Sequence, residues 1–364
     1  PDGNHLASAS MDETVCICNV EPEHRVQEIK GAEVFYGTGN LAAFMGGGEL
    51  FAARSGDHIA VWNVTTGRRV HEFAPLTKFL GEDSSGENIL TLIPRAGIAV
   101  LQFWDRHDFR LKKELRVQAD VADVADAIFS RDASLNLSRQ SLLLSLPGEV
   151  VQVDCANGSI LRRILLPGMR GFTFRLSSDE TAWAAFVPRS DLAGVGPTER
   201  PHEATGLEGH RGGIRSLAFS PTQSLLATAS FDNTARLWDA SSGRQVAVLY
   251  GHKEGVIDCA FSPDGRTLAT ASGDRTVKLW HVPTQRDMLT LTHDFPVGAV
   301  AFSREGNYLA TETVDGTYHF WRAASWEEIK TAGAPVRSDE GATLREGKIS
   351  TVSSTNYDAT HATK

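Results

Sequence analysis

Residues 252–280 read HKEGVIDCAFSPDGRTLATASGDRTVKLW, and closely similar segments stand at residues 210–238 and 293–321. The three segments align without gaps, and each runs from a His to a Trp over the same length. Self-similarity of this kind is the signature of a repeat protein, in which each unit buries its apolar surface against its neighbours. The sequence therefore predicts stacked copies of one small structural unit.

Turn residues divide each unit into strands. The run Ser262-Pro263-Asp264-Gly265 places Pro at the second and Gly at the fourth position of a type I turn, so the apolar runs on either side should form a hairpin. A second tight turn, at Asp274, precedes a strand that ends at Trp280, and a fourth strand such as Gln245–Leu249 follows each such Trp. We expect a four-stranded antiparallel meander of about 40 residues in each unit.

The strand at residues 256–261, VIDCAF, is apolar on both of its alternating faces. A sheet with one wet face would alternate between apolar and polar residues, so both faces of this sheet should be covered. Exposed apolar surface costs roughly 25 cal/mol per Å², which disfavours a lone sheet. Radial stacking covers both faces, and the fold class predicted is an all-β propeller of four-stranded blades.

The period continues through weaker units, with a Phe closing the first strand at positions 129, 174, 219, 261 and 302. Residues 188–209 contain Pro188, Pro197 and Pro201 and show no recognisable third strand. Residues 335–364 are polar, and we expect them to be unordered. The propeller would occupy residues 1–334 as eight blade-like units, at residues 1–30, 31–73, 74–118, 119–166, 167–209, 210–251, 252–292 and 293–334.

The unit at residues 1–30 lacks a first strand, and Cys18 stands where the other units have Trp. We favour one ring in which this first blade is incomplete or borrows a strand from the tail. The alternative is a seven-bladed ring with an additional partial blade, since propellers carry four to eight blades.

Gly-His, S-P-D-G, L-A-T-A-S-x-D-x-T and L-W resemble the WD40 repeat over residues 207–323. The resemblance implies that a His, a hydroxyl residue, the turn Asp and the Trp form a hydrogen-bonded tetrad within each blade. Carried over residue by residue, the tetrads are His210, Ser230, Asp232 and Trp238; His252, Ser272, Asp274 and Trp280; and His293, Thr313, Asp315 and Trp321. The hydroxyl member stays open, because Thr228 and Thr270 stand two residues before the assigned Ser.

Composition limits the partners. The net charge is -9 and the pI is about 5.8, which disfavours binding to nucleic acid or to an anionic membrane. Cys16, Cys18, Cys155 and Cys259 are too scattered for a disulfide framework or a zinc site, so we expect reduced thiols. No apolar run approaches the roughly 20 residues that cross a bilayer, and no signal peptide is recognisable. A cytoplasmic protein with a protein or peptide partner is expected.

Catalysis is not predicted. The His-Ser-Asp sets recur in three units together with a Trp, as a structural feature of a repeating blade would and an active site would not. Residues 37–42 fit the G-x-G-x-x-[GA] pattern of dinucleotide sites, but Gly46-Gly47-Gly48 and an extended stretch follow in place of a helix. No phosphate-loop, zinc-protease or calcium-loop pattern occurs. We therefore expect no enzyme activity, no cofactor and no metal.

Resemblance to the WD40 family places the binding surface on the narrower face of the ring, at the residue before each turn Asp: Phe231, Gly273 and Val314. An exposed Phe231 could anchor a partner, with charged contacts from Arg211, Lys253 and Arg275. In the alternative, Phe231 packs on the next loop. The predicted function is a non-catalytic protein-interaction scaffold or regulatory module.

A second hypothesis is the C-terminal sensor or regulatory part of a larger signalling enzyme. Residues 320–330, FWRAASWEEIK, resemble the final blade of the WD40 arrays attached to bacterial serine/threonine kinases. Because Pro1 falls inside a hairpin turn, the chain is expected to be a fragment, with removal of a Met ahead of Pro1 as the alternative. In the second hypothesis, a catalytic domain lies upstream of Pro1. A hydrolytic or oxidoreductase propeller is a third hypothesis, but the blade positions assemble no set of carboxylates, histidines or metal ligands for it.

Overall fold

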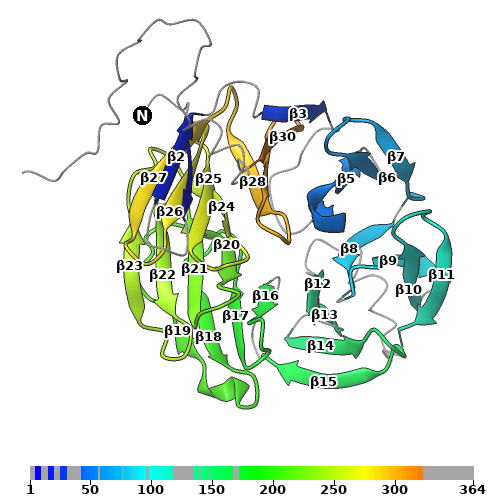
Figure 1. The fold of residues 1–364 in the computed structure, drawn as a ribbon. Coiled ribbons are helices and arrows are strands. Elements are labelled where there is room, and N and C mark those ends of the chain that lie inside the picture. Colours follow the sequence, from blue (N-terminus) through cyan, green and yellow to red (C-terminus); the bar gives the residue numbers. More distant parts are fainter. Residues whose placement is uncertain are drawn as a thin grey trace, which may run out of the picture. The chain divides into compact units, whose positions relative to one another are not determined.

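The computed structural model describes residues 5–9, 15–19, 25–30, 42–55, 58–75, 77–83, 85–95, 98–117, 135–138, 141–146, 148–166 and 172–322. These residues form seven four-stranded antiparallel sheets and one two-stranded sheet, all within the compact unit Pro1–Ala324. In Figure 1 the sheets of this unit follow one another around a ring. The unit is a seven-bladed β-propeller, and the tail prediction for residues 335–364 lies outside the described residues.

Six blades are each built from consecutive strands. Blade 1 consists of β4 (Ala42–Met45), β5 (Leu50–Ser55), β6 (His58–Asn63) and β7 (Arg69–Glu72), with the short helix η2 (Gly46–Gly48) between β4 and β5. Blade 2 consists of β8 (Lys78–Glu82), β9 (Asn88–Arg95), β10 (Ile98–Asp105) and β11 (Leu111–Arg116). Blade 3 consists of β12 (Leu135–Ser138), β13 (Ser141–Leu146), β14 (Glu149–Asp154) and β15 (Ile160–Leu165).

Blade 4 consists of β16 (Thr173–Leu176), β17 (Ala182–Phe186), β18 (Ala193–Pro197) and β19 (Thr205–Gly206), with η3 (Pro201–Glu203) before β19. Blade 5 consists of β20 (Ile214–Phe219), β21 (Leu225–Ser230), β22 (Ala235–Asp239) and β23 (Gln245–Leu249). Blade 6 consists of β24 (Val256–Phe261), β25 (Thr267–Ser272), β26 (Thr276–His281) and β27 (Arg286–Thr292). The first strands of neighbouring blades contact one another, as β20, β24 and β28 do, so these strands lie toward the centre of the ring.

Blade 7 joins the two ends of the ring. Its first three strands are β28 (Val297–Phe302), β29 (Tyr308–Thr313) and β30 (Thr317–Arg322). Its fourth strand is β3 (Arg25–Lys30), which pairs antiparallel with β30 and lies beside it in Figure 1. This pairing satisfies the edge of β30, which would otherwise present unpaired backbone groups.

The structure corrects the predicted number of blades. The described part of residues 1–30 contributes β3 to blade 7 and a separate hairpin, β1 (His5–Ala9) and β2 (Val15–Asn19). Eight blades are not shown, and the described sheets correspond to the seven-bladed alternative. The N-terminal segment supplies a strand to the last blade. The prediction was the reverse, that the first blade takes a strand from the C-terminal tail.

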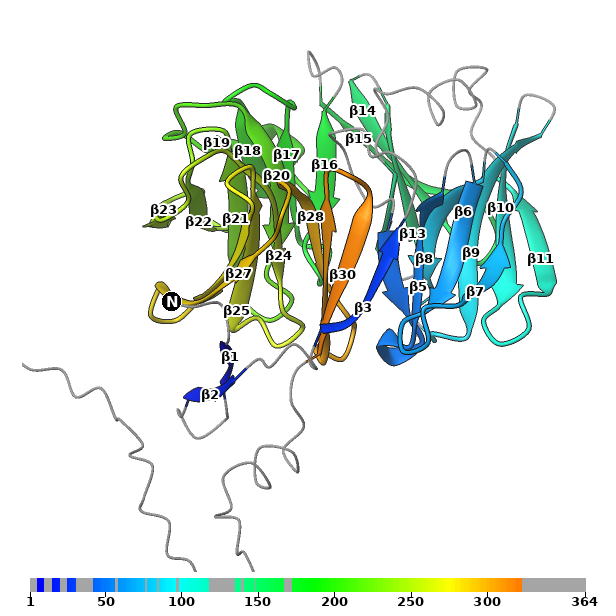
Figure 2. The same cartoon turned by 90° about the horizontal axis from the view of Figure 1, so that it is seen from above.

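The apolar core lies between the blades. One cluster joins Leu237 and Leu249 of blade 5 to Val256, Leu268 and Trp280 of blade 6, and similar clusters join the other neighbouring blades of the described region. Figure 2 shows the strands of these blades aligned with roughly the same axis, side by side around the ring. Each sheet is therefore buried on both faces, as the apolar strand at residues 256–261 predicts.

Blade 4 departs from the sequence interpretation in two respects. Residues 188–209 do contain a third strand, β18, and the short fourth strand β19. The repeating Phe is also misaligned there. In blade 5 Phe219 pairs with Leu226, and the residue at the corresponding place in blade 4 is Leu176, which pairs with Trp183. Phe174, which the sequence interpretation aligned with Phe219, lies two residues before that place. The predicted marker Phe129 lies outside the described residues.

Candidate functional site

Four side chains of blade 5 form a continuous chain of hydrogen bonds. His210 Nδ1 lies 2.8 Å from Asp232 Oδ2, and His210 Nε2 lies 2.7 Å from Thr228 Oγ1. Trp238 Nε1 donates to the same hydroxyl at 2.9 Å. The side chains come from the loop before β20, from β21, from the following turn and from β22, so the bonds tie this loop and turn to the two middle strands of the blade.

Blade 6 repeats the arrangement. His252 lies 3.0 Å from Asp274 Oδ2 through Nδ1 and 2.8 Å from Thr270 Oγ1 through Nε2, and Trp280 donates to Thr270 at 2.9 Å. Thr270 is fully buried and Trp280 nearly so. The same spacing in sequence thus places the same four groups in contact in both blades.

The hydroxyl in these sets belongs to Thr, which corrects the assignment of Ser230 and Ser272. Ser230 donates to the carbonyl of Gly212 and accepts from the backbone N–H of Asp232. Ser272 makes the equivalent bonds to Glu254 and Asp274. Because residues two apart share a face of a strand, spacing alone could not distinguish the Thr from the Ser.

In blade 7 the pattern changes. His293 Nε2 lies 2.8 Å from Thr311 Oγ1, and Trp321 Nε1 donates to that hydroxyl at 3.3 Å. Asp315 accepts hydrogen bonds from the hydroxyls of Thr313 and Thr317. The predicted member Thr313 therefore binds the Asp, while Thr311 takes the place between His and Trp.

The electrostatics of blade 5 identify the protonation of this set. Burial is the main influence on His210 and lowers its pKa, so the imidazole is neutral near pH 7. Burial alone would raise the pKa of Asp232, but hydrogen bonds from Thr234, the Arg211 backbone and His210 outweigh it and lower the pKa to about 2. A neutral His that donates from Nδ1 to the carboxylate accepts the Thr228 hydroxyl proton at Nε2. Every group is thus engaged, and the Thr228 hydroxyl is too deeply buried to meet a substrate.

Blades 2 and 4 do not repeat the full set of bonds. In blade 2, Trp104 Nε1 donates to Thr91 at 2.8 Å, and the ring of Phe73 lies 5.3 Å from the Trp104 ring where blades 5 and 6 have His. In blade 4, Gly196 opposes Trp183, whereas in blade 5 Trp238 opposes Leu226. The Trp of blade 4 therefore stands on the neighbouring strand, which explains why the sequence signature fades there.

The tetrads position the predicted binding residues. The backbone N–H of Arg211 donates to Asp232 Oδ2 at 3.0 Å, and that of Lys253 donates to Asp274 Oδ2 at 2.8 Å. Both side chains are exposed, as is that of Arg275, while Val314 is half-buried. The loops before the first strands are thus held to the turns before the third strands, and their side chains extend from a fixed backbone.

Phe231 is both packed and exposed. A methyl group on Gly255, in the loop before blade 6, would lie only 2.5 Å from Phe231 Cδ1, so the ring rests directly on this loop. The Arg215 guanidinium lies 5.1 Å from the centre of the ring on another side. Nevertheless, 48% of Phe231 remains exposed. The two sequence hypotheses for Phe231 are therefore compatible, because the ring packs on the next loop and still presents half its surface.

Sequence reasoning missed Arg215 and Arg189. Arg215 is the additional residue of a β-bulge in β20, at the position that Ile257 occupies in blade 6. Arg189 precedes β18 and donates its backbone N–H to the carbonyl of Ile214 at 3.1 Å. The available signal was a charged residue inside the mostly apolar strand at residues 214–219, IRSLAF.

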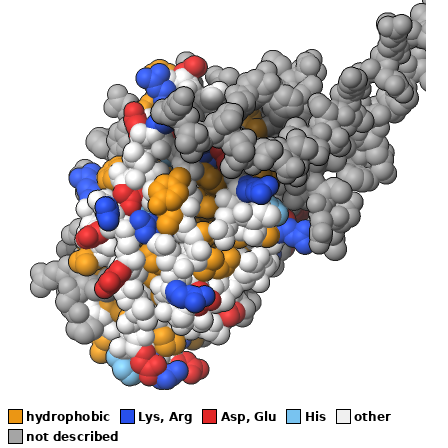
Figure 3. Space-filling view, turned by 90° about the vertical axis from the view of Figure 1, so that its left-hand side faces the viewer, with side chains coloured by type: hydrophobic (Ala, Val, Ile, Leu, Met, Phe, Trp, Pro, Cys, Tyr) orange, Lys and Arg blue, Asp and Glu red, His pale blue; other side chains and the backbone are white. Residues whose placement is uncertain are grey.

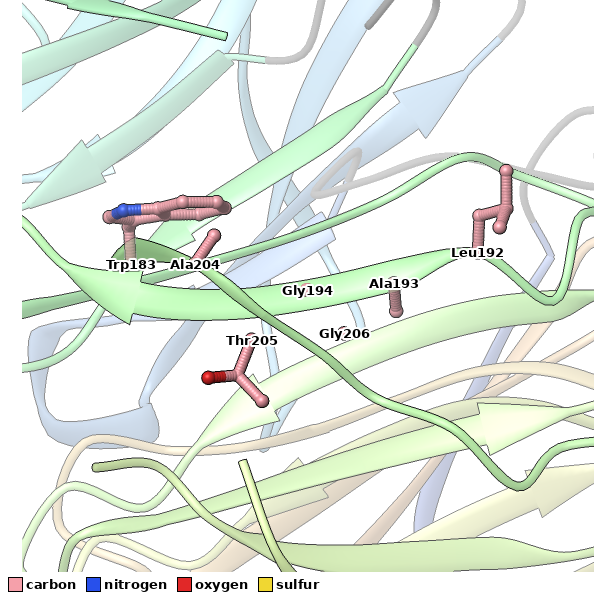
Figure 4. Close-up of a pocket in the computed structure, with 7 residues that line it drawn as sticks. All are labelled: Trp183, Leu192, Ala193, Gly194, Ala204, Thr205 and Gly206. Carbon is pink, nitrogen blue, oxygen red and sulfur yellow. The ribbon is translucent and has the colours of Figure 1, made fainter. Parts of the chain in front are cut away.

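Other surfaces are less specific. A shallow cavity of about 220 Å³ in blade 4 is lined by Trp183, Leu192, Ala193, Gly194, Ala204, Thr205 and Gly206, with Trp183 and Leu192 at opposite ends in Figure 4. Figure 3, which shows the side where β23 and β27 lie, has apolar side chains interspersed with charged ones.

Within the described residues, no cluster of three His, Cys, Asp or Glu side chains is suited to a metal, and no helix is long and apolar enough to cross a membrane.

Comparison with protein families gives three matches to one family model. Residues 202–239, 243–281 and 286–322 match the family described as WD domain, G-beta repeat. The matched segments cover most of blades 5, 6 and 7, where the His-Thr-Trp bonds are found. A search of curated proteins found no match for the chain.

Proposed function

Since the chain is a WD40-repeat β-propeller, we propose that it is a non-catalytic scaffold that binds a protein or peptide partner on the face containing Phe231. WD40 propellers commonly act as protein-interaction scaffolds. The cytoplasmic location, the absence of nucleic-acid and membrane partners, and the relation to a larger signalling enzyme stay predictions.

The observation that carries the proposal is the exposed Phe231 on a rigid support. Aromatic side chains of this kind dominate interface energetics when they enter a pocket of the partner. Phe231 is held by Gly255 and Arg215, so little conformational entropy remains to be lost on binding. The surface is therefore suited to recognition without rearrangement.

Exposed positive side chains on the loops and turns of blades 5 and 6 support the same surface. Arg211, Lys253 and Arg275 are exposed on the loops and turns of blades 5 and 6, although the whole chain carries a net charge of -9. Positive side chains on the same loops and turns as an aromatic anchor favour partners with a complementary acidic segment and accelerate the encounter. Val314, at the equivalent turn of blade 7, would contribute apolar contact at the edge of this surface.

Affinity capture with the purified ring, followed by mass spectrometry and titration of the captured partner, tests the proposal. Phe231→Ala should weaken the partner by about 2 kcal/mol or more and leave the melting temperature nearly unchanged. Leu161→Ala, which truncates an exposed side chain on β15 of blade 3, is the matched control and should leave affinity intact. Equal affinity of the Phe231→Ala variant would remove this face from consideration.

A further inference from the structure

Arg215 is a buried cation that lacks a partner. Only 8% of the residue is exposed, and its Nε atom is fully buried without a hydrogen-bond partner. Among the described residues the guanidinium makes no hydrogen bond and no ion pair, and its contact is the face of the Phe231 ring at 5.1 Å. Burial of an arginine without a counter-ion is strongly unfavourable.

The neighbouring charges do not relieve this cost. Burial is the main cause that lowers the pKa of Arg215, and the nearby Arg189 lowers it further, while Asp258 acts in the opposite direction. The Asp258 carboxylate is engaged elsewhere, because it accepts the backbone N–H groups of Val300 at 3.0 Å and of Cys259 at 2.9 Å, and a hydrogen bond from Ser216. Arg215 thus retains unused donors beside a second positive charge.

The fold does not require an arginine at this position. The equivalent bulge residue of blade 6 is Ile257, which is also 8% exposed, and that of blade 7 is Gly298. An aliphatic side chain therefore fills the same position in the neighbouring blade. An arginine that is costly for folding and unnecessary for packing indicates a role in binding.

Arg189 and Phe231 converge on Arg215 from two blades. The backbone of Arg189, before β18 in blade 4, packs on the loop before β20, where a methyl group on Gly213 would lie 2.6 Å from the Arg189 carbonyl carbon, and the charge of Arg189 lowers the pKa of Arg215. The Phe231 ring, from the turn between β21 and β22 of blade 5, covers the guanidinium and is itself half exposed. A guanidinium without a hydrogen-bond partner, lying against an aromatic ring and under the influence of a second arginine charge, is an arrangement that an anion would complete.

We infer that Arg215 and Arg189 bind an oxyanion of the partner peptide, either a carboxylate or a phosphate ester, beside the Phe231 ring. The inference rests on the proposed scaffold function and assigns the chemistry that the partner must carry. Arg215 supplies the buried fork of donors, which matches the two oxygens of such a group, and Arg189 adds positive charge at its edge.

Thermal unfolding tests the anion site without a partner. Inorganic phosphate or acetate, compared with chloride at equal ionic strength, should raise the melting temperature of the full chain by about 2 °C or more. Arg215→Ile, which copies the residue of blade 6, should abolish this response without lowering the melting temperature in chloride. Arg189→Gln changes an exposed side chain and should reduce the response, whereas Arg244→Gln, in the β22–β23 turn, should leave it intact. A lower melting temperature of Arg215→Ile in chloride, or no anion response in the wild type, would overturn the inference.

Selection from two random heptapeptide libraries, one of them containing phosphoserine, identifies the source of the oxyanion. We expect enrichment of Asp or Glu in the first library or of phosphoserine in the second, with affinity about 30-fold weaker for Arg215→Ile. The anion site would be refuted by selected peptides that lack an acidic group and bind Arg215→Ile as tightly as the wild type. If these peptides lose affinity for Phe231→Ala, the proposed scaffold function still stands. Selected peptides that are insensitive to both variants would count against the proposed binding face as well.

Discussion

Replacement of Thr270 by Val removes one hydroxyl from the centre of blade 6 and keeps the shape of the side chain. That hydroxyl accepts from Trp280 Nε1 at 2.9 Å and lies 2.8 Å from His252 Nε2. Thr270 is fully buried, and Trp280 and His252 are 3% and 8% exposed, so water cannot replace the lost bonds. The substitution therefore leaves two buried polar groups without partners.

The expected cost follows from these two groups. Each unsatisfied buried polar group costs about 1 to 3 kcal/mol, so the loss of partners for two groups should lower the free energy of unfolding by about 2 to 6 kcal/mol. Trp280→Phe removes the donor itself, and in that background the same Thr270→Val substitution should cost about 1 kcal/mol less. The difference isolates the bond between Trp280 and Thr270.

Guanidinium unfolding followed by tryptophan fluorescence and circular dichroism measures these free energies. Thr292→Val, on the exposed outer strand β27, is the matched control and should change stability by no more than about 0.5 kcal/mol. If Thr270→Val costs no more than this control, the bond network does not stabilise the blade and the reasoning fails.

Three further predictions follow from the fold and the titrating groups. The pKa of Asp232 in the folded protein is about 2, below its ordinary value of 3.8, so the unfolded chain binds more protons between about pH 4 and pH 2. The free energy of unfolding should therefore fall by about 2 kcal/mol as the pH is lowered through this window. Acid unfolding curves of Asp232→Asn should show a smaller loss. Deletion of residues 1–30 removes β3 from blade 7, so it should lower the melting temperature and promote aggregation, which light scattering measures. Deletion of residues 1–20 keeps β3 and should have a smaller effect. Equal effects of the two deletions would contradict the closure of the ring by the pairing of β3 with β30. Burial raises the pKa of the Cys155 thiol to about 12, so iodoacetamide should modify Cys155 only after unfolding, as peptide mapping would show; rapid modification of the folded protein would disprove the buried thiol.

Local patterns in the sequence were sufficient to predict the turns and strands of the repeats in which each residue has one structural role. The turn Ser262–Gly265 lies between β24 and β25, and Trp280 lies on β26, as the spacing predicts. Spacing could not distinguish two hydroxyl residues that stand two apart on the same face of a strand. Ser272 was therefore assigned to the tetrad, whereas Thr270 makes the hydrogen bonds with His252 and Trp280. The weak blades were also harder to read, since Phe73 and Trp183 fill positions by volume and leave no characteristic motif.

The amino-acid sequence by itself determined the repeating blade, because tight turns and strands that are apolar on both faces are local properties that only stacking of small sheets satisfies. The tertiary structure decided the number of blades, since β3 pairs with β30 across almost the whole chain and no local pattern encodes that pairing. It also decided the character of the proposed binding face. Arg189, Arg215 and Phe231 come from two blades, and a buried arginine without a counter-ion can be recognised only when all its neighbours are known.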